Sequence, residues 1–216
     1  MKYRAVLFDL DGTLLDTIED ITSSMNSVLA RLGFRGHERV EYKYLVGEGI
    51  ETLVYRALPE AHRDDSTVAR CLAAMMEEYR VQGLNNTRPY PGIPDLLDSL
   101  HTQGVRMAVL SNKPDDSTRS IVTALLPRWK FDLVLGSRPT VPLKPDPAAA
   151  LEIAGRVGIA PEQFIYCGDT EVDMRLARAA RMYPAGALWG YRTAGELRSA
   201  GAQILLDTPG DLLNCL

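Results

Sequence analysis

Apolar runs of strand length alternate with segments of helical pattern along most of the chain. The strand-like runs cover residues 5–10, 105–111, 131–136, 163–169 and 183–190. Helical patterns stand between them, over residues 93–104, 147–158 and 171–182. Parallel strands need crossover helices and are apolar on both faces. The alternation therefore predicts an α/β fold, with a Rossmann-like parallel sheet as its core.

One long segment between the first two of these strands carries no strand pattern. Apolar residues recur at helical spacing over residues 18–32, after an Asp16-Thr17 pair that can cap a helix, and Gly33 ends the pattern. Further helical patterns cover residues 51–58 and 68–80. The chain then returns through residues 88–92, whose prolines and glycine suit a stiff hinge. We expect a core of residues 1–16 and 88–216 and an inserted helical cap of residues 17–87.

Polar residues gather where the predicted strands end. In the first run Asp9 and Asp11 are two positions apart, so they are expected to face the same side while Leu10 points into the core. Ligands of open α/β sheets bind outside the carboxyl ends of the strands. Each polar residue alone also fits a turn or a helix cap, but their coincidence at four strand ends favours a shared site. These residues are Asp9, Asp11, Ser111, Asn112, Lys144, Asp169 and Thr170, with Asp173 one helical turn later.

Phosphoryl transfer through a phosphorylated aspartate needs this set of groups. A carboxylate can attack phosphorus and split one difficult displacement into two. Because the carboxylate and the phosphate are both anions, a hard cation must lie between them, and Mg²⁺ prefers oxygen ligands. Asp9 and Asp169 can supply carboxylates to that ion. The sequence therefore predicts Mg²⁺ as the cofactor.

Composition narrows the possible partners and the compartment. The chain has 216 residues, of which 46% are hydrophobic, and its net charge is −4 with no long basic run, so nucleic acid is not an expected partner. No segment approaches about 18 uninterrupted apolar residues, which predicts no membrane span. The 3 cysteines lie far apart, as expected of reduced thiols. We expect a cytoplasmic protein, with the choice between monomer and homodimer left open.

Four segments in this order resemble the signature motifs of the haloacid dehalogenase-like superfamily of phosphatases: DLDGTLLDT, LSNKPDD, LKPDP and CGDTEVDM. VGEGIETLVYRAL and SNKP are most similar to its phosphoglycolate phosphatase branch. The resemblance implies that Asp9 is the nucleophile and Asp11 the general acid and base, with Lys144 as the third catalytic residue. It implies Mg²⁺ ligands from Asp9, Asp169 and the Asp11 carbonyl, with Asp173 and Thr170 beside them. The implied substrate-binding residues in the core are Thr13, Ser111 and Asn112.

The Gly47-Glu48-Gly49 loop of the predicted cap is the remaining candidate for substrate binding. Two glycines around one residue permit a tight turn close to a ligand, although a plain turn between helices explains them equally well. Lys43 or Arg56 beside the loop could meet a substrate carboxylate, which Glu48 would oppose. Three residues depart from the family pattern: Ser111 stands where this branch often has threonine, Glu171 adds an acid near the predicted metal, and Arg181 replaces a helix-ending glycine.

The expected activity is hydrolysis of small phosphorylated metabolites, with phosphoglycolate as the candidate substrate. The alternative is a phosphosugar mutase of the same superfamily, similar to β-phosphoglucomutase. A dehalogenase is disfavoured because the family's dehalogenases need no metal and lack the second aspartate. A non-enzymatic signalling module of the receiver type is also disfavoured, because it would need only about 120 residues, the size of one small domain, and no cap.

Overall fold

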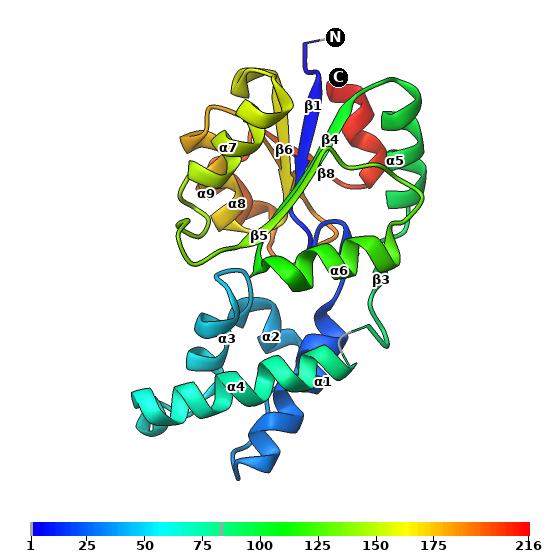
Figure 1. Cartoon of the computed structure of the whole chain (residues 1–216). Coiled ribbons are helices and arrows are strands. Elements are labelled where there is room, and N and C mark those ends of the chain that lie inside the picture. Colours follow the sequence, from blue (N-terminus) through cyan, green and yellow to red (C-terminus); the bar gives the residue numbers. More distant parts are fainter. Residues whose placement is uncertain (1, 83) are drawn as a thin grey trace.

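A six-stranded parallel sheet forms the centre of the molecule over the described part of the chain, which is residues 2–82 and 84–216 of a computed structural model (Figure 1). Met1 and Gly83, which belong to the predicted core and cap ranges, lie outside the described residues. The strand order is β5-β4-β1-β6-β7-β8. The strands are β1 (Ala5–Phe8), β4 (Arg106–Pro114), β5 (Leu133–Ser137), β6 (Phe164–Gly168), β7 (Tyr183–Ala187) and β8 (Ile204–Leu206). The predicted α/β class is confirmed.

Strand β1 lies inside the sheet, between β4 and β6, and its side chains are buried on both faces. Val6 and Phe8 belong to the apolar cluster on one face, and Ala5 and Leu7 belong to the cluster on the other. Both faces of a parallel sheet are covered by helices, which explains why this strand has no polar alternation. The burial is complete at all four positions.

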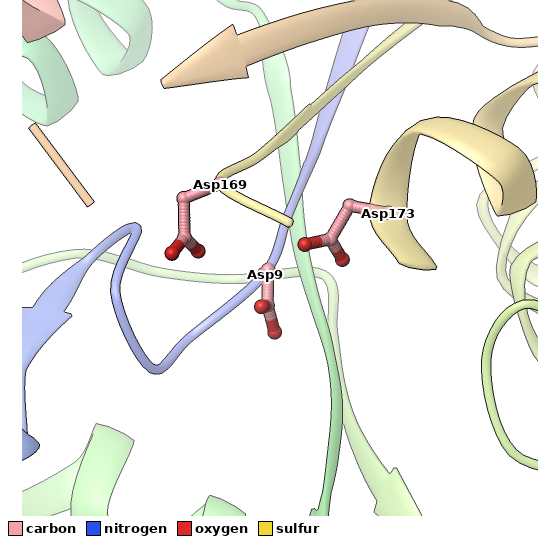
Figure 2. Close-up of side chains that lie close together, drawn as sticks. All are labelled: Asp9, Asp169 and Asp173. Carbon is pink, nitrogen blue, oxygen red and sulfur yellow. The ribbon is translucent and has the colours of Figure 1, made fainter. Parts of the chain in front are cut away.

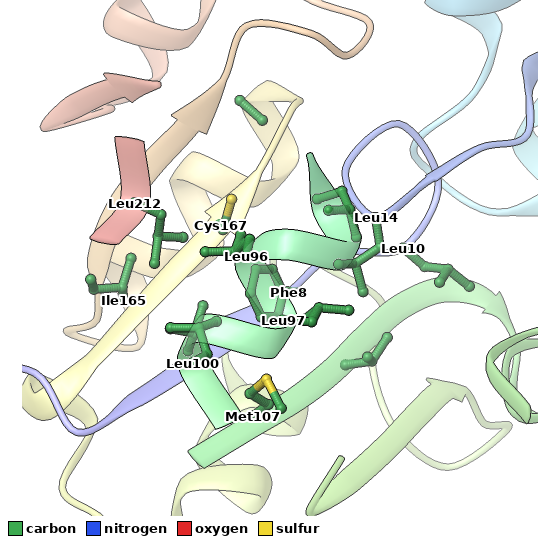
Figure 3. Close-up of a cluster of buried hydrophobic side chains, with 14 of the residues drawn as sticks. Phe8, Leu10, Leu14, Leu96, Leu97, Leu100, Met107, Ile165, Cys167 and Leu212 are labelled. Carbon is green, nitrogen blue, oxygen red and sulfur yellow. The ribbon is translucent and has the colours of Figure 1, made fainter. Parts of the chain in front are cut away.

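Helices cover the two faces of this sheet. On one face α5 (Ile93–Thr102) packs with the 3₁₀ helix η3 (Pro209–Cys215), and Leu96, Leu97 and Leu100 of α5 lie against Phe8 and its neighbours (Figure 3). The other face carries apolar side chains of α7 and α8. The remaining helices of this part are α6 (Asp115–Leu125), α7 (Ala148–Val157), η2 (Pro161–Gln163), α8 (Glu171–Ala179) and α9 (Ala194–Ala200).

Within the described residues 18–82, four α-helices form a second layer with its own apolar cluster, below the sheet in Figure 1. They are α1 (Ile18–Arg31), α2 (Arg39–Leu45), α3 (Ile50–Ala57) and α4 (Asp65–Gln82), with the 3₁₀ helix η1 (Glu60–His62). The chain enters through β2 (Leu15–Asp16) and leaves through β3 (Arg88–Pro89), which pair antiparallel. Among the described residues no helix has the length and apolar character to cross a bilayer.

The two connections are also joined by Asp20, near the start of α1. Its carboxylate is 2% exposed and accepts hydrogen bonds from the backbone and side chains of Asn86 and Thr87, at 2.6–3.0 Å. Burial raises the pKa of Asp20, but these hydrogen bonds outweigh burial and hold its pKa below the usual range. The carboxylate therefore fixes the outgoing connection against the incoming helix.

Two local predictions differ from the structure, and Arg181 keeps the backbone conformation of the glycine that it replaces. Strand β1 ends at Phe8, so Asp9 and Asp11 lie in the following turn and do not share a strand face, although Leu10 is buried in the core as predicted. Thr17 precedes α1, but its hydroxyl makes no capping bond and lies 3.1 Å from the Tyr191 hydroxyl. Arg181 has φ of 60°, a backbone region where glycine is favoured.

Candidate active site

The carboxyl ends of the parallel strands meet the inserted helices at one cavity of about 490 Å³. Asp9 and Asp11 reach it from the turn after β1, Ser111 and Asn112 from β4, and Lys144 from the loop after β5. The opposite wall comes from α1, α3, α4 and the segment before α3. Residues predicted from three separate strand ends therefore line a single space, whereas Asp169, Thr170 and Asp173 are not among the described residues that line it.

Three buried carboxylates lie at the sheet side of this cavity. Each of Asp9, Asp169 and Asp173 offers an oxygen within 4.8 Å of the other two. Figure 2 shows them gathered where β1, β6 and the start of α8 come together. Asp9 is 6% exposed, and the other two side chains are fully buried. Burying three carboxylates so close together costs free energy unless positive charge lies beside them.

Lys144 supplies part of that positive charge. Its ammonium lies 2.8 Å from Asp9 Oδ1 and 2.8 Å from Asp173 Oδ1. Burial alone would lower the pKa of Lys144, but the attraction of Asp173 and Asp9 outweighs burial and raises the pKa. The lysine is thus held in its charged form between two acids.

The carboxylate of Asp173 is fully occupied by protein donors. Its Oδ1 accepts from Lys144 at 2.8 Å and from the Tyr166 hydroxyl at 3.0 Å, while Oδ2 accepts from the Thr170 backbone at 3.1 Å and hydroxyl at 2.6 Å. The Thr170 and Asp173 pair is a capping box at the start of α8. Since four donors already surround it, Asp173 is suited to orienting Lys144.

Asp169 has fewer donors and a different surrounding. It accepts from the Thr13 hydroxyl at 2.8 Å and from the Tyr191 backbone at 2.9 Å. Burial, followed by repulsion from Asp173, raises the pKa of Asp169 to about 7, and the same two causes raise the pKa of Asp9. Thr13 is fully buried and is not among the described residues that line the cavity, so its position differs from that of a substrate-binding residue.

Glycines bring the backbone close to Asp169. A Cβ atom on Gly12, whose φ is +87°, would lie 2.3 Å from Asp169 Oδ2. A Cβ atom on Gly190 would lie 2.3 Å from Asp169 Cβ and 2.5 Å from the Gly12 carbonyl oxygen. The carboxylate is therefore enclosed by backbone that only glycine allows to approach so closely.

Asp11 lies apart from the three buried acids and pairs with a lysine that the sequence analysis did not single out. Its Oδ2 is 3.1 Å from Lys113 Nζ, while Oδ1 is buried without a hydrogen-bond partner among the described residues. Lys113 also donates to the Tyr79 hydroxyl at 3.3 Å and lies 4.6 Å from that ring's centre. Burial opposes the charge of Lys113, but Asp11 outweighs burial and raises the pKa of the lysine.

Lys113 and Tyr79 differ in how visible they are in the sequence. Lys113 follows Asn112 within SNKP, so its position beside a strand-end site could have identified it. Tyr79 lies on α4, far from any strand end in the sequence, and nothing in its local pattern indicates that it reaches Asp11.

Asn112 joins the sheet to the loop before α3. Its Nδ2 donates to the Gly47 carbonyl at 3.0 Å and to the Lys144 carbonyl at 3.1 Å, and its Oδ1 accepts from the Lys144 backbone at 2.8 Å. Ser111 is 4% exposed and lines the cavity, with its hydroxyl accepting from the Lys113 backbone at 3.1 Å. The loop is therefore tied directly to Asn112, which also holds the backbone of Lys144.

The cap loop supplies backbone and little charge to the cavity. Gly47 and Gly49 line it with φ of +115° and +91°. Glu48 instead pairs with Arg56 at 2.7 Å, and among the described residues neither of these, nor Lys43, is part of the cavity wall. The suggestion that Lys43 or Arg56 meets a substrate carboxylate is therefore not supported by their positions. Glu171 pairs with Arg192 at 2.9 Å.

Comparison with known proteins identifies relatives along nearly the whole chain. Residues 6–187 match the family model of haloacid dehalogenase-like hydrolases. Phosphoglycolate phosphatase 1 of Pseudomonas aeruginosa is 34% identical over 98% of this chain and 79% of its own length. The phosphoglycolate phosphatase of Aquifex aeolicus is 31% identical, over 99% and 96%. A crystal structure from Lactobacillus delbrueckii subsp. bulgaricus, assigned by inference as a phosphoglycolate phosphatase, gives a TM-score of 0.94 at 32% identity, covering 100% and 98% of the two chains.

Proposed function

Because this chain belongs to the haloacid dehalogenase-like hydrolase family, we propose that it is a magnesium-dependent phosphatase that hydrolyses small phosphate monoesters through a phosphorylated aspartate. The observation that carries the proposal is the buried group of Asp9, Asp169 and Asp173 with Lys144, of which Asp9 and Lys144 line a cavity between the sheet and the inserted helices. Residues 1–16 and 88–216 form the catalytic core of this proposal, and residues 17–87 form its cap.

Asp9 acts as the nucleophile. Its carboxylate oxygen forms a bond to phosphorus while the bond from phosphorus to the ester oxygen breaks, and the phosphoryl group passes to the enzyme. Lys144, 2.8 Å from Asp9, is close enough to hold a transferring phosphoryl oxygen, and the Ser111 hydroxyl offers a second contact on the same wall. Water then attacks the phosphorus, the bond from phosphorus to the Asp9 oxygen breaks, and inorganic phosphate leaves while the Asp9 carboxylate is restored.

Asp11 handles the protons of both steps. In the first step it donates a proton to the departing ester oxygen, and in the second it accepts one from the attacking water. Its position supports this assignment, because Asp11 lines the same cavity as Asp9 and the Oδ1 atom of Asp11 has no hydrogen-bond partner among the described residues. Lys113 fixes the other oxygen of the same carboxylate.

The residues present fit a magnesium ion. Its ligands would be Asp9, Asp169 and the backbone carbonyl of Asp11. Burial and repulsion between the acids disfavour the charged forms of Asp9 and Asp169, and a bound cation would stabilise those charged forms. Asp173 is not assigned as a ligand because four protein donors already occupy its carboxylate. When bound, Mg²⁺ supplies positive charge that reduces the repulsion between the nucleophile and the phosphate.

Phosphoglycolate, which appears in the names of the relatives, is the first ester to test. We expect the purified protein to release inorganic phosphate from a panel of small monoesters in Mg²⁺ and to lose this activity in EDTA. Asp9→Asn should abolish both phosphate release and labelled phosphoenzyme, because an amide oxygen is a poor nucleophile. Asp95→Asn, at an exposed position in α5, is the matched control that should retain both. Turnover in EDTA or phosphorylated Asp9→Asn protein would contradict the proposal.

A further inference from the structure

The inserted helices present an apolar wall to the active-site cavity. This wall has contributions from α1, α3, α4 and the segment before α3, and aliphatic or sulfur-containing side chains dominate it. Its apolar residues are Ile21, Val46, Ile50, Leu53, Met75 and Met76. Tyr79 and Tyr191 add aromatic rings at the edge toward the sheet. A leaving group attached to a phosphate held by the sheet would therefore meet hydrocarbon on the cap side.

The charged side chains near this wall are already paired. On α4, Glu77 and Arg80 line the cavity but bind each other at 2.7 Å, and both are more than half exposed to solvent. Lys113 is engaged by Asp11 at 3.1 Å and by Tyr79. Within the described part of the chain, the cap wall thus offers no unpaired cation for a carboxylate on the leaving group.

The cavity also has more room than a two-carbon ester requires. Its volume of about 490 Å³ falls within the range of roughly 300–1,000 Å³ that is common for pockets binding drug-sized molecules. The phosphoryl group occupies only the end near Asp9 and Lys144. The remaining space extends along the apolar wall, where the Met76 side chain, 51% exposed, can adapt to different shapes.

We propose that this site selects phosphate monoesters with an uncharged, apolar alkyl or aryl leaving group and discriminates against a short carboxylate such as glycolate. The proposal rests on the phosphatase function proposed above and specifies its substrate class. Burying each methylene against the wall is worth ~0.8 kcal/mol, which corresponds to about a fourfold gain in kcat/KM. Placing a carboxylate on the same wall costs desolvation without a partner.

A series of linear alkyl phosphates tests the proposal, because ethyl, butyl and hexyl phosphate differ in apolar surface while the leaving alcohol keeps a similar reactivity. We expect kcat/KM to rise by about tenfold or more from ethyl to butyl phosphate, following the methylene increment, and to be lowest for phosphoglycolate. A flat series, or a kcat/KM for phosphoglycolate above that for butyl phosphate, would overturn the proposed selectivity.

Acetyl phosphate separates this failure from failure of the phosphatase assignment. Its activated leaving group demands little from the cap wall, so acetyl phosphate turnover together with a flat alkyl series would overturn the selectivity alone. Absence of phosphate release from acetyl phosphate and from every ester would overturn both proposals.

A charge placed on the wall provides a second test. Met76 lines the cavity and is 51% exposed, so Met76→Lys adds a solvated cation there without burying it. We expect this variant to raise the ratio of kcat/KM for phosphoglycolate to that for butyl phosphate by about tenfold, the value of one modest ionic contact. Val81→Lys, also on α4 and 66% exposed but outside the cavity wall, should leave the ratio unchanged. If the ratio of the two kcat/KM values is the same in both variants, the proposal that the cap wall selects the leaving group is contradicted.

Discussion

Replacing Lys144 with methionine removes the fixed positive charge from the acidic site while nearly preserving the side-chain length. Lys144 is 5% exposed, and its ammonium lies 2.8 Å from both Asp9 and Asp173. Removing one partner of a buried ion pair costs about 3–5 kcal/mol, because the remaining charge is left uncompensated. Since whole proteins are stable by only about 5–15 kcal/mol, the loss should be readily measurable.

The size of this loss should depend on pH. Burial and repulsion from Asp173 already raise the pKa of Asp9 and bring the pKa of Asp169 to about 7, while the charge of Lys144 lowers both values. Lys144→Met therefore raises them further. An acid whose pKa is higher in the folded than in the unfolded protein loses stability as pH rises from the unfolded value to the folded one. The variant should thus be more strongly destabilised at about pH 8 than at about pH 5, where the acids can hold protons.

Urea unfolding in EDTA measures the effect as a difference in the free energy of unfolding. We expect Lys144→Met to lose about 3–5 kcal/mol at the higher pH and at least about 1 kcal/mol less at the lower pH. Lys130→Met, at an exposed lysine, is the control and should stay within about 0.5 kcal/mol of the unmodified protein. A loss that is the same at both pH values would refute the argument that carboxylate repulsion causes it.

Three further predictions follow from the same contacts. Because the pKa of Asp169 is raised to about 7, the metal-free protein should lose stability as pH rises from about 4 to about 7. Mg²⁺ should therefore raise Tm more at about pH 8 than at about pH 5, and equal increases in Tm would contradict the prediction. Gly12→Ala should lower Mg²⁺-dependent kcat/KM by about a hundredfold while circular dichroism shows a folded protein, because its Cβ would displace Asp169; unchanged kinetics would show that the backbone can yield. Asn112→Ala should reduce the free energy of unfolding, measured in urea, by about 2–4 kcal/mol, because the Lys144 backbone loses both of its hydrogen bonds to this side chain. A loss under about 1 kcal/mol would show that water replaces these hydrogen bonds.

The central sheet was predictable because a strand that is buried on both faces appears in the sequence as a continuous apolar run. The apolar runs at β1, β4, β5, β6 and β7 were all identified, whereas β8 was missed because its three residues are too few to show a pattern. Helix α6 was also missed, since its sequence DDSTRSIVTAL contains many polar and β-branched residues that have weak helix preference. It is a helix because Ile121 and Val122 pack on the sheet.

The strand-end residues were predictable for a topological reason, and the cap wall was not. Parallel strands bring their carboxyl ends to one edge, so Asp9, Ser111 and Asp169 could be grouped before any coordinates were known. Which side chains of α4 face that edge depends on how the inserted helices dock, and neither Tyr79 nor Met76 carries a sequence signal for it. The extension of β4 to Pro114, beyond the predicted end at Ser111, likewise depends on its irregular pairing with β5.

The interior position of β1 has a consequence for how the chain folds during synthesis. This strand leaves the ribosome before both of its neighbours in the sheet, which begin only at Arg106 and Phe164. The helices of residues 18–82 are made in between, and their contacts with one another span shorter stretches of sequence than those of β1, so they can assemble earlier. Strand β1 therefore cannot pair with both of its neighbours until most of the protein has been translated. During that interval AVLF is an unpaired apolar segment, the kind of segment that is prone to aggregation.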